Sequence, residues 1–180
     1  MNDDAPRTDP VEWAPLLERL TDDEMTVAVA GSLTGGRLAS RLTDAPGASK
    51  VVLGGVVSYA TEVKISVLKV PEALVDDHGV ISAECAASMA EGIRDLMGST
   101  YGLSTTGVAG PEEQEGKAVG TVFVAVAAGD GTSVVPLSLE GDREHIQERT
   151  VDAVLSELAA RMDESEAAPD GRGAEDPALR

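Results

Sequence analysis

Apolar positions follow two rhythms along the chain. Runs rich in β-branched and small apolar residues predict five strands, at residues 25–30, 51–59, 101–106, 119–128 and 133–139. Apolar residues at helical spacing predict four helices, at residues 11–20, 35–42, 82–97 and 142–162. Strands that alternate with helices and then form a hairpin predict an α/β fold, with layers of helices packed on a mixed sheet.

Residues typical of helix ends and turns support these boundaries. Ser82 and Asp142 are suited to cap the third and fourth helices, and Pro10 fits the first turn of the first helix. The pair at 130–131, Asp-Gly, is a strong signal for a two-residue turn between the last two strands.

We expect one domain with loose ends. Residues 10–162 contain neither a repeat nor a linker, and they form the predicted domain. Residues 1–9 are expected to be flexible. Residues 163–180 combine Ala, Gly, Pro and acidic side chains without an apolar period, which predicts a disordered acidic tail.

The chain is strongly acidic, with a formal net charge of −18. Residues 1–24 hold eight acidic and two basic side chains, and residues 163–180 hold six and two, so the predicted domain is acidic as well. Such a surface repels phosphates and argues against a nucleic-acid partner. An aromatic content of 2% and a low lysine count favour adaptation to high salt, with an ordinary acidic protein as the alternative.

We predict a cytoplasmic location without a membrane partner. No apolar run reaches the roughly 18 residues that a membrane helix needs. The N-terminal sequence MNDDAPRTDP is acidic and lacks the apolar core of a signal peptide. The only cysteine, Cys85, cannot form an internal disulfide, which fits a reducing compartment.

The first candidate for chemistry is the segment 30–36, Ala-Gly-Ser-Leu-Thr-Gly-Gly, which leaves a predicted strand and opens a helix. Its glycines allow the backbone to approach a ligand closely, and backbone N–H groups near residues 34–36 suit an anion or a developing oxyanion. Ser32 would expose its hydroxyl at this turn. The alternative is that Ser32 or Thr34 only caps the helix.

The second candidate is the segment 54–64, in which Lys64 follows an apolar strand. A lysine next to a buried strand end loses charge through desolvation and becomes a usable base for a serine. His78 falls in a predicted loop and His145 on a predicted helix surface, so a pair of Ser32 and Lys64 is the more economical arrangement. The alternative is that Lys64 is a solvated helix residue.

Two further segments suit an anionic substrate. Residues 105–111, Thr-Thr-Gly-Val-Ala-Gly-Pro, end a strand in hydroxyls and glycines, where ligands bind in open α/β sheets. Arg143 follows the capping Asp142, where a cation opposes the helix dipole, so an anion such as a phosphate is its expected partner. An ordinary loop and an ion pair with a nearby carboxylate are the alternatives.

Neither a metal nor a cofactor is expected. The sequence has no metal-ligand spacing, no phosphate-binding loop of the Walker type and no dinucleotide-binding fingerprint. Cys85 lies on the apolar face of a predicted helix and is expected to be a core residue.

Taken in order, these segments resemble the CinA C-terminal domain family, whose members include nicotinamide-nucleotide amidases. The matching motifs are SLTGG at 32–36, GGVVSYATEVK at 54–64, TTGVAGP at 105–111, VGTV at 119–122 and GDR at 141–143. Residues 42–50 and 78–82 are also similar to the family. The resemblance covers about residues 10–162, and it is specific as an ordered set.

The resemblance implies a three-layer α/β/α fold and hydrolysis of nicotinamide mononucleotide to nicotinic acid mononucleotide and ammonia, a step of pyridine nucleotide salvage. Ser32 would be the nucleophile, Lys64 its base and Tyr59 an aid to proton transfer. The residues that would shape the substrate and phosphate site are Thr34, Gly35, Gly36, Thr106, Gly107 and Arg143. The implied partner is a small nucleotide substrate, and a homo-oligomer is left open.

The sequence departs from the family pattern close to the serine. Gly31 stands where the family has an acidic residue, Leu33 stands for Cys, Thr61 for Asn and Ala118 for Pro, and residues 112–115 are unusually acidic. A non-catalytic nucleotide-binding or regulatory module of the same fold is therefore the second hypothesis. An amidase for a different small carboxamide is the third.

Overall fold

The computed structural model describes residues 12–167. A five-stranded sheet runs through it in the order β2-β1-β3-β4-β5. The strands are β1 (Val27–Gly31), β2 (Val52–Val57), β3 (Tyr101–Gly107), β4 (Thr121–Ala128) and β5 (Gly131–Ser138). β1 pairs in parallel with β2 and β3, whereas β3, β4 and β5 pair antiparallel, which confirms the predicted mixed sheet.

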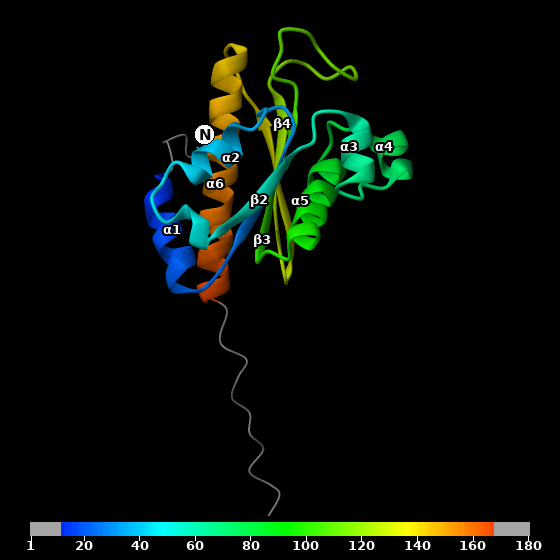
Figure 1. Cartoon of the computed structure of the whole chain (residues 1–180). Helices are drawn as coiled ribbons and strands as arrows, with labels where there is room; N and C mark the ends of the chain where they lie inside the picture. The colour runs from blue at the N-terminus through cyan, green and yellow to red at the C-terminus, as the bar shows by residue number, and fades with distance from the viewer. Residues whose placement is uncertain (1–11, 168–180) are drawn as a thin grey trace, which may run out of the picture.

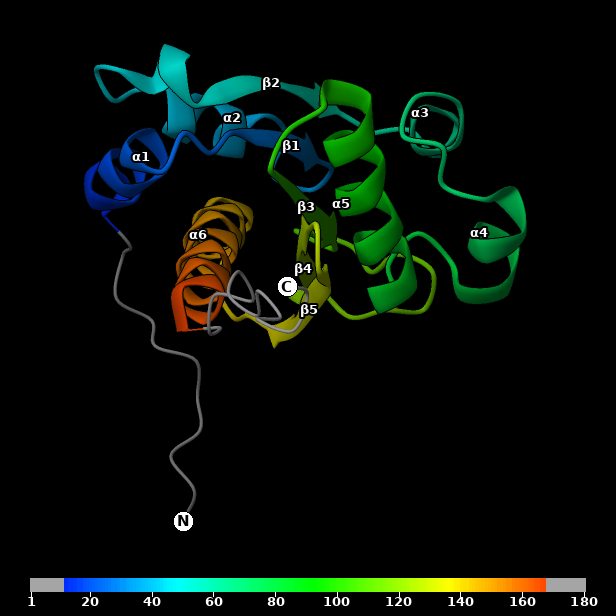
Figure 2. The same cartoon turned by 90° about the horizontal axis from the view of Figure 1, so that it is seen from below.

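Helices cover both faces of the sheet, as Figures 1 and 2 show. One layer holds α1 (Trp13–Asp22), α2 (Arg37–Thr43) and α6 (Arg143–Ala167), and a short 3-10 turn, η1 (Ala48–Lys50), precedes β2. The other layer holds α3 (Thr61–Ser66), α4 (Glu72–His78) and α5 (Ala83–Met97). The three-layer α/β/α architecture in one domain is thus confirmed.

The two faces of the sheet differ in side-chain size because residues on a strand alternate between faces. In β1, Val27 and Val29 belong to the large core beneath α1, α2 and α6, whereas Ala28 and Ala30 face the layer of α5. α5 packs so closely that a Cβ added at Gly102 would lie 2.1 Å from a backbone oxygen of that helix. The small residues on this face of the sheet therefore allow α5 to pack closely against it.

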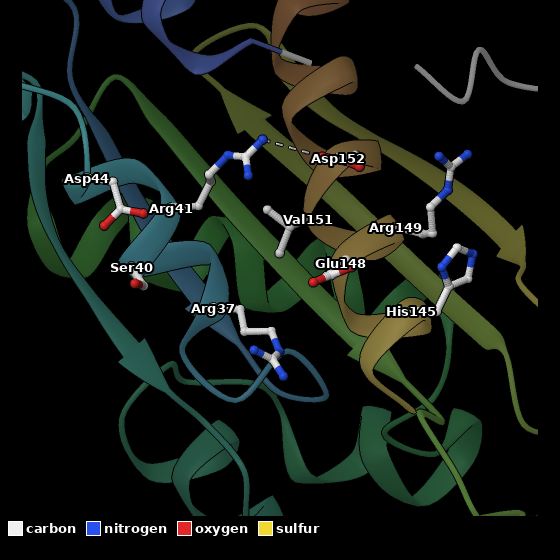
Figure 3. A pocket seen from close by; sticks show the side chains of 9 residues that line it. All are labelled: Arg37, Ser40, Arg41, Asp44, His145, Glu148, Arg149, Val151 and Asp152. Atoms are coloured by element: carbon white, nitrogen blue, oxygen red, sulfur yellow. Dashed lines mark ion pairs between the residues drawn. The ribbon is translucent and has the colours of Figure 1, made fainter. Parts of the chain in front are cut away.

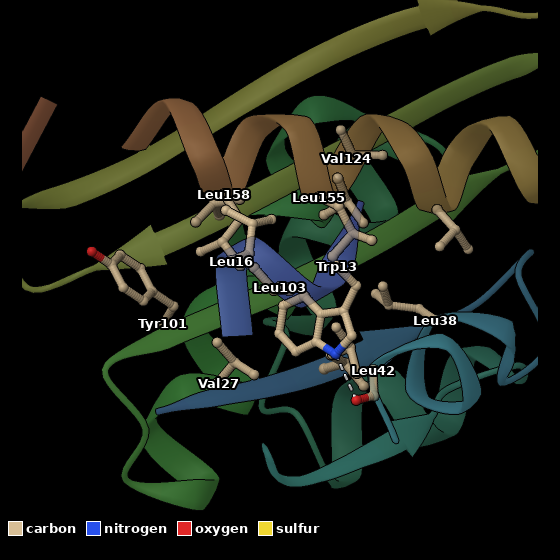
Figure 4. Packing of buried hydrophobic residues seen from close by; sticks show 14 of the residues in the cluster. Trp13, Leu16, Val27, Leu38, Leu42, Tyr101, Leu103, Val124, Leu155 and Leu158 are labelled. Carbon is tan, nitrogen blue, oxygen red and sulfur yellow. Dashed lines mark hydrogen bonds between the residues drawn. The ribbon is translucent and has the colours of Figure 1, made fainter. Parts of the chain in front are cut away.

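Trp13, the first residue of α1, belongs to the large core. Its indole lies among the leucines of α1, α2 and α6 in Figure 4, and it is 5% exposed. The indole Nε1 donates a hydrogen bond to the carbonyl of Leu42 at 2.8 Å. This bond ties α1 to the end of α2 and satisfies the polar group of a buried aromatic ring.

Both predicted helix caps are present. Ser82 precedes α5 and its hydroxyl accepts a hydrogen bond from the Cys85 N–H at 3.1 Å. Asp142 precedes α6 and its carboxylate accepts one from the His145 N–H at 2.9 Å.

The structure corrects several predicted boundaries. α3 and α4 were not predicted, and His78 is the last residue of α4 rather than a loop residue. The hairpin turn consists of 129–130 instead of 130–131, because Ala128 pairs with Gly131 in the strand register. The two short helices α3 and α4 were missed because their segments contain too few apolar residues to establish a helical period.

The last helix continues to Ala167 and not to Met162, so the first five residues of the predicted tail are helical. Arg161 supports this extension through ion pairs with Glu164 at 2.9 Å and Asp130 at 2.6 Å. The predicted flexible segment 1–9, Pro10 and the rest of the tail lie outside the described residues. Within the described part, no helix combines the length and apolar character needed to span a membrane.

Candidate functional site

The carboxyl ends of the three parallel strands meet at one edge of the sheet. The chain leaves β1 for α2 on one face and leaves β2 for α3 on the opposite face (Figures 1 and 2). Connections that diverge in this way open a crevice at the strand ends, which is the usual ligand site of open α/β sheets. Three of the four segments predicted to carry chemistry follow these strand ends, and the fourth, with Arg143, comes after β5.

Ser32 occupies a turn that is fixed by backbone hydrogen bonds. It follows β1 directly, and its N–H donates to the carbonyl of Thr105 in β3 at 3.0 Å. The Gly35 N–H donates back to the Ser32 carbonyl at 3.0 Å, and Gly36 then takes a left-handed conformation with φ 95° before α2 begins. The glycines therefore allow a sharp strand-to-helix turn that begins at Ser32.

Lys64 approaches this serine from α3. Its side chain is among the largest that are fully buried, with 1% exposed. The Nζ atom donates hydrogen bonds to the carbonyl of Ser58 at 2.6 Å and to the Ser32 Oγ at 3.1 Å. The fold thus brings together the predicted nucleophile and base, and it excludes the alternative of a solvated Lys64.

Burial lowers the pKa of Lys64 from its ordinary value of 10.5. Cys85 and Glu115 act in the opposite direction, since negative charge nearby favours the protonated amine. Desolvation is the larger effect, so a neutral amine is more accessible here than on a solvated lysine. A neutral amine 3.1 Å from a hydroxyl is suited to accept its proton.

A cavity of about 140 Å³ opens beside this pair. Six of the nine predicted site residues line it: Ser32, Tyr59, Lys64, Thr106, Gly107 and Arg143. Arg143 donates to the carbonyl of Gly110 at 2.6 Å and to the Tyr59 hydroxyl at 3.0 Å. Tyr59 therefore contacts the predicted phosphate-binding arginine, and its predicted part in proton transfer stays a prediction.

The other three predicted residues do not line this cavity. Thr34 is buried beneath the turn, where its Oγ1 lies 3.0 Å from the Oγ1 of Thr105. Thr34 and Gly36 line a separate hollow of about 40 Å³ against β2. The N–H of Gly35 is engaged within the turn. These residues shape the turn that presents Ser32.

Sequence reasoning did not assign two walls of the cavity. Val80 and Ile81 form one wall, and the Thr106 Oγ1 donates to the carbonyl of Val80 at 2.6 Å. Glu112 and Gln114 contribute to a second wall. The signals were present in the sequence, as the family-like segment 78–82 and the acidic residues 112–115, but neither carried a motif of known chemistry.

A second, larger hollow of about 530 Å³ lies between α2 and α6 (Figure 3). Three arginines line it, and three carboxylates balance them, with Arg41 and Asp152 paired at 3.9 Å. Its lining contains neither Ser32 nor Lys64. A hollow with balanced charge and no activated nucleophile is the weaker candidate for a reaction site.

Residues 12–167 contain no group of three or more His, Cys, Asp or Glu side chains placed to hold a metal ion. Cys85 is fully buried, and burial raises the pKa of its thiol to about 11. It is therefore a core residue, as predicted.

Comparison with known proteins identifies the family. The family model of the CinA C-terminal domain matches residues 13–162. The chain belongs to this family. A CinA-like protein from Frankia casuarinae is 51% identical over 147 residues, which are 82% of this chain and 34% of that protein.

Solved structures agree with this assignment. The competence damage-inducible protein A from Klebsiella pneumoniae superimposes with a TM-score of 0.81 at 29% identity, over 84% of this chain and 94% of that one. A competence-damaged protein superfamily member from Escherichia coli gives 0.81 at 27% identity, over 88% and 98%. The chain thus matches almost the whole of these two structures but only about a third of the length of the curated relatives.

Proposed function

We propose that this CinA-family chain is an amidohydrolase that converts nicotinamide mononucleotide to nicotinic acid mononucleotide and ammonia. The observation that carries the proposal is the contact between a fully buried Lys64 and Ser32, at 3.1 Å beside a cavity. A buried amine of lowered pKa next to a serine hydroxyl is the arrangement that serine–lysine acyl transfer requires.

The reaction proceeds in two half-reactions. Neutral Lys64 accepts the Ser32 hydroxyl proton while Oγ forms a bond to the carboxamide carbon. The tetrahedral intermediate collapses as Lys64 returns that proton to the amide nitrogen, the C–N bond breaks, and ammonia leaves an ester on Ser32. Water then attacks the ester with Lys64 again as base, and the carboxylic acid is released as Ser32 recovers its proton.

One cavity residue, Arg143, suits an anionic nucleotide. The guanidinium of Arg143 has five N–H donors, and its two bonds to Gly110 and Tyr59 leave others for a phosphate. The cavity is smaller than the roughly 300 Å³ at which ligand pockets usually begin. We therefore place the carboxamide end inside and the ribose phosphate at the mouth beside Arg143.

The second candidate function is nucleotide binding without turnover. Glu112 lines the cavity with a carboxylate, which repels a phosphate. Gly31 lacks the acidic side chain that the family pattern has before the serine. Either feature is compatible with a domain that still binds the nucleotide but no longer hydrolyses its carboxamide.

Product analysis separates these functions. Purified protein is incubated with nicotinamide mononucleotide at low and at high salt, and ammonia and nicotinic acid mononucleotide are quantified together. Equal molar release of both products supports the amidohydrolase. Saturable binding of the mononucleotide without release supports the second candidate, and turnover of other small carboxamides in its place supports an amidase of different specificity.

A further inference from the structure

Glu115 stands in an unusual backbone conformation beside the cavity. Gln114 and Lys117 exchange two backbone hydrogen bonds, at 3.2 and 2.8 Å, so Glu115 and Gly116 are the two central residues of a tight hairpin. Both have positive φ, 52° and 67°. This pattern belongs to the turn type that favours Asn or Gly at both positions, so a glutamate there is held against its backbone preference.

The Glu115 side chain provides the compensation. One carboxylate oxygen, Oε2, accepts hydrogen bonds from the N–H groups of Val80 and Ile81 at 3.1 and 3.2 Å. Gly79 leaves room for it, because a Cβ at that position would lie 2.6 Å from Oε2. A hydrogen bond whose acceptor is an ionised carboxylate is stronger than one between neutral groups. These hydrogen bonds join the hairpin to the segment before α5, although Glu115 and Val80 are 35 residues apart in sequence.

These hydrogen bonds join two segments that line the reaction cavity. Val80 and Ile81 belong to one segment, and Gln114 of the hairpin and the preceding Glu112 belong to the other. Val80 is held from its other side by the Thr106 hydroxyl. Without the Glu115 carboxylate, the hairpin has no described bond to Val80 or Ile81, whose N–H groups would lose their charged acceptor.

We propose that Glu115 is a positioning residue, which holds the loop of residues 112–117 next to Val80 and Ile81 and so keeps these cavity-lining segments in place beside Ser32 and Lys64. The proposal rests on the proposed function in one respect, since the reaction is what this cavity would serve. The negative charge of Glu115 also favours the protonated form of Lys64. The other ionisable groups on the cavity wall are Tyr59, Glu112 and Arg143.

Glu115→Gln tests the proposal because it removes the charge and nearly preserves the size. Glu115→Asp keeps the charge on a shorter side chain, and Glu113→Gln is the matched control, an exposed glutamate of the same hairpin that does not line the cavity. Two readouts are independent of turnover: amide hydrogen exchange at Val80 and Ile81, and NMR titration of lysine ¹³Cε signals. The chain has four lysines, and Lys64→Met assigns the signal of Lys64.

We expect Glu115→Gln to accelerate exchange at Val80 and Ile81 about tenfold or more, and to move the pKa of Lys64 further down. Glu115→Asp should accelerate exchange but leave the titration of Lys64 near that of the parent protein. In turnover, Glu115→Gln should raise KM and shift the pH midpoint of kcat/KM downward, and Glu115→Asp should restore the midpoint but not KM.

The proposal is overturned if Glu115→Gln matches Glu113→Gln in both exchange and lysine titration, whatever the activity. If both readouts change as expected while the parent protein releases no ammonia, the positioning role of Glu115 stands and the proposed amidohydrolase function fails. The two claims are therefore decided by separate measurements.

Discussion

Lys64 contacts Ser32 across 3.1 Å although 32 residues separate them in sequence. The serine directly follows β1 and begins the turn that leads to α2, and the lysine projects from α3 after β2. Because β1 and β2 are parallel neighbours, their carboxyl ends bring these two segments together. The contact is thus a consequence of sheet topology, and it makes several outcomes measurable.

The reaction should depend on the protonation of Lys64. If neutral Lys64 is the base, kcat/KM for amide hydrolysis should rise about tenfold per pH unit at acid pH and level off above the pKa of Lys64. Burial lowers that pKa, so the midpoint should lie below 10.5. A pH profile of the initial rates measures it, and Lys50→Met, which alters an exposed lysine, is the control. A profile that is flat, or that falls with rising pH over this range, contradicts the role of Lys64 as base.

Gly31 should tolerate a side chain poorly. A Cβ at this position would lie 2.8 Å from the Thr34 Oγ1, which is held near Thr105. We expect Gly31→Ala to lower the free energy of unfolding by about 1 to 3 kcal/mol through overpacking. In a Thr34→Ala background the cost should be smaller, and urea unfolding of all four proteins gives the coupling. Equal costs in both backgrounds would show that Thr34 is not the obstacle.

The strand ends and six of the residues that line the cavity were predictable from the sequence, whereas the burial of Lys64 was not. The apolar run at 25–30 predicted a strand, and the glycine-containing segment 30–36 predicted a turn from that strand into a helix. α3 and α4 are six and seven residues long, too short for a helical period to emerge. Without α3 the sequence left open whether Lys64 is solvated, and only its packing position decides this.

The cavity walls show a second limit. Thr34, Gly35 and Gly36 belong to the same motif as Ser32, yet they do not line the cavity. The Thr34 side chain is directed to Thr105, and the two glycines contribute only backbone to the turn. Glu115 was hidden for a similar reason. Its partners are backbone N–H groups, which leave no trace in the sequence.

Cys85 should be inert in the native protein. It is fully buried and burial raises its thiol pKa to about 11, so little thiolate is exposed to a reagent at neutral pH. A disulfide reagent such as DTNB should react with less than about one tenth of the thiol in native protein, and with all of it in urea. Fast native reaction, at the rate of the unfolded chain, would contradict the packing of α5 described above.

Trp13 should report and support the large core. Trp13→Phe removes the donor to Leu42 and leaves a buried carbonyl unpaired, with an expected loss of about 1 to 3 kcal/mol of unfolding free energy. Circular dichroism during urea unfolding measures this loss, because Trp13 is the only tryptophan and its fluorescence disappears with the substitution. A stability equal to that of the parent protein would mean that the Leu42 bond contributes nothing net.

The adaptation to high salt stays a prediction that unfolding tests. Screening of a net charge of −18 should stabilise the chain, so the urea midpoint should rise steadily from low to molar KCl. The same series in sodium sulfate controls for general salting-out. A midpoint that is insensitive to KCl would favour an ordinary acidic protein.

Ammonia release by two single variants tests whether Ser32 and Lys64 carry out the hydrolysis. Ser32→Ala removes the nucleophile and Lys64→Ala removes the base, while Ser49→Ala and Lys50→Ala make the same changes in the exposed turn η1. With nicotinamide mononucleotide as substrate, we predict that each of the first two variants loses at least about a thousandfold in kcat/KM. The two η1 variants should remain within about twofold of the parent protein. If folded Ser32→Ala or Lys64→Ala keeps activity near the parent level, the substituted residue is neither the nucleophile nor the base of this reaction.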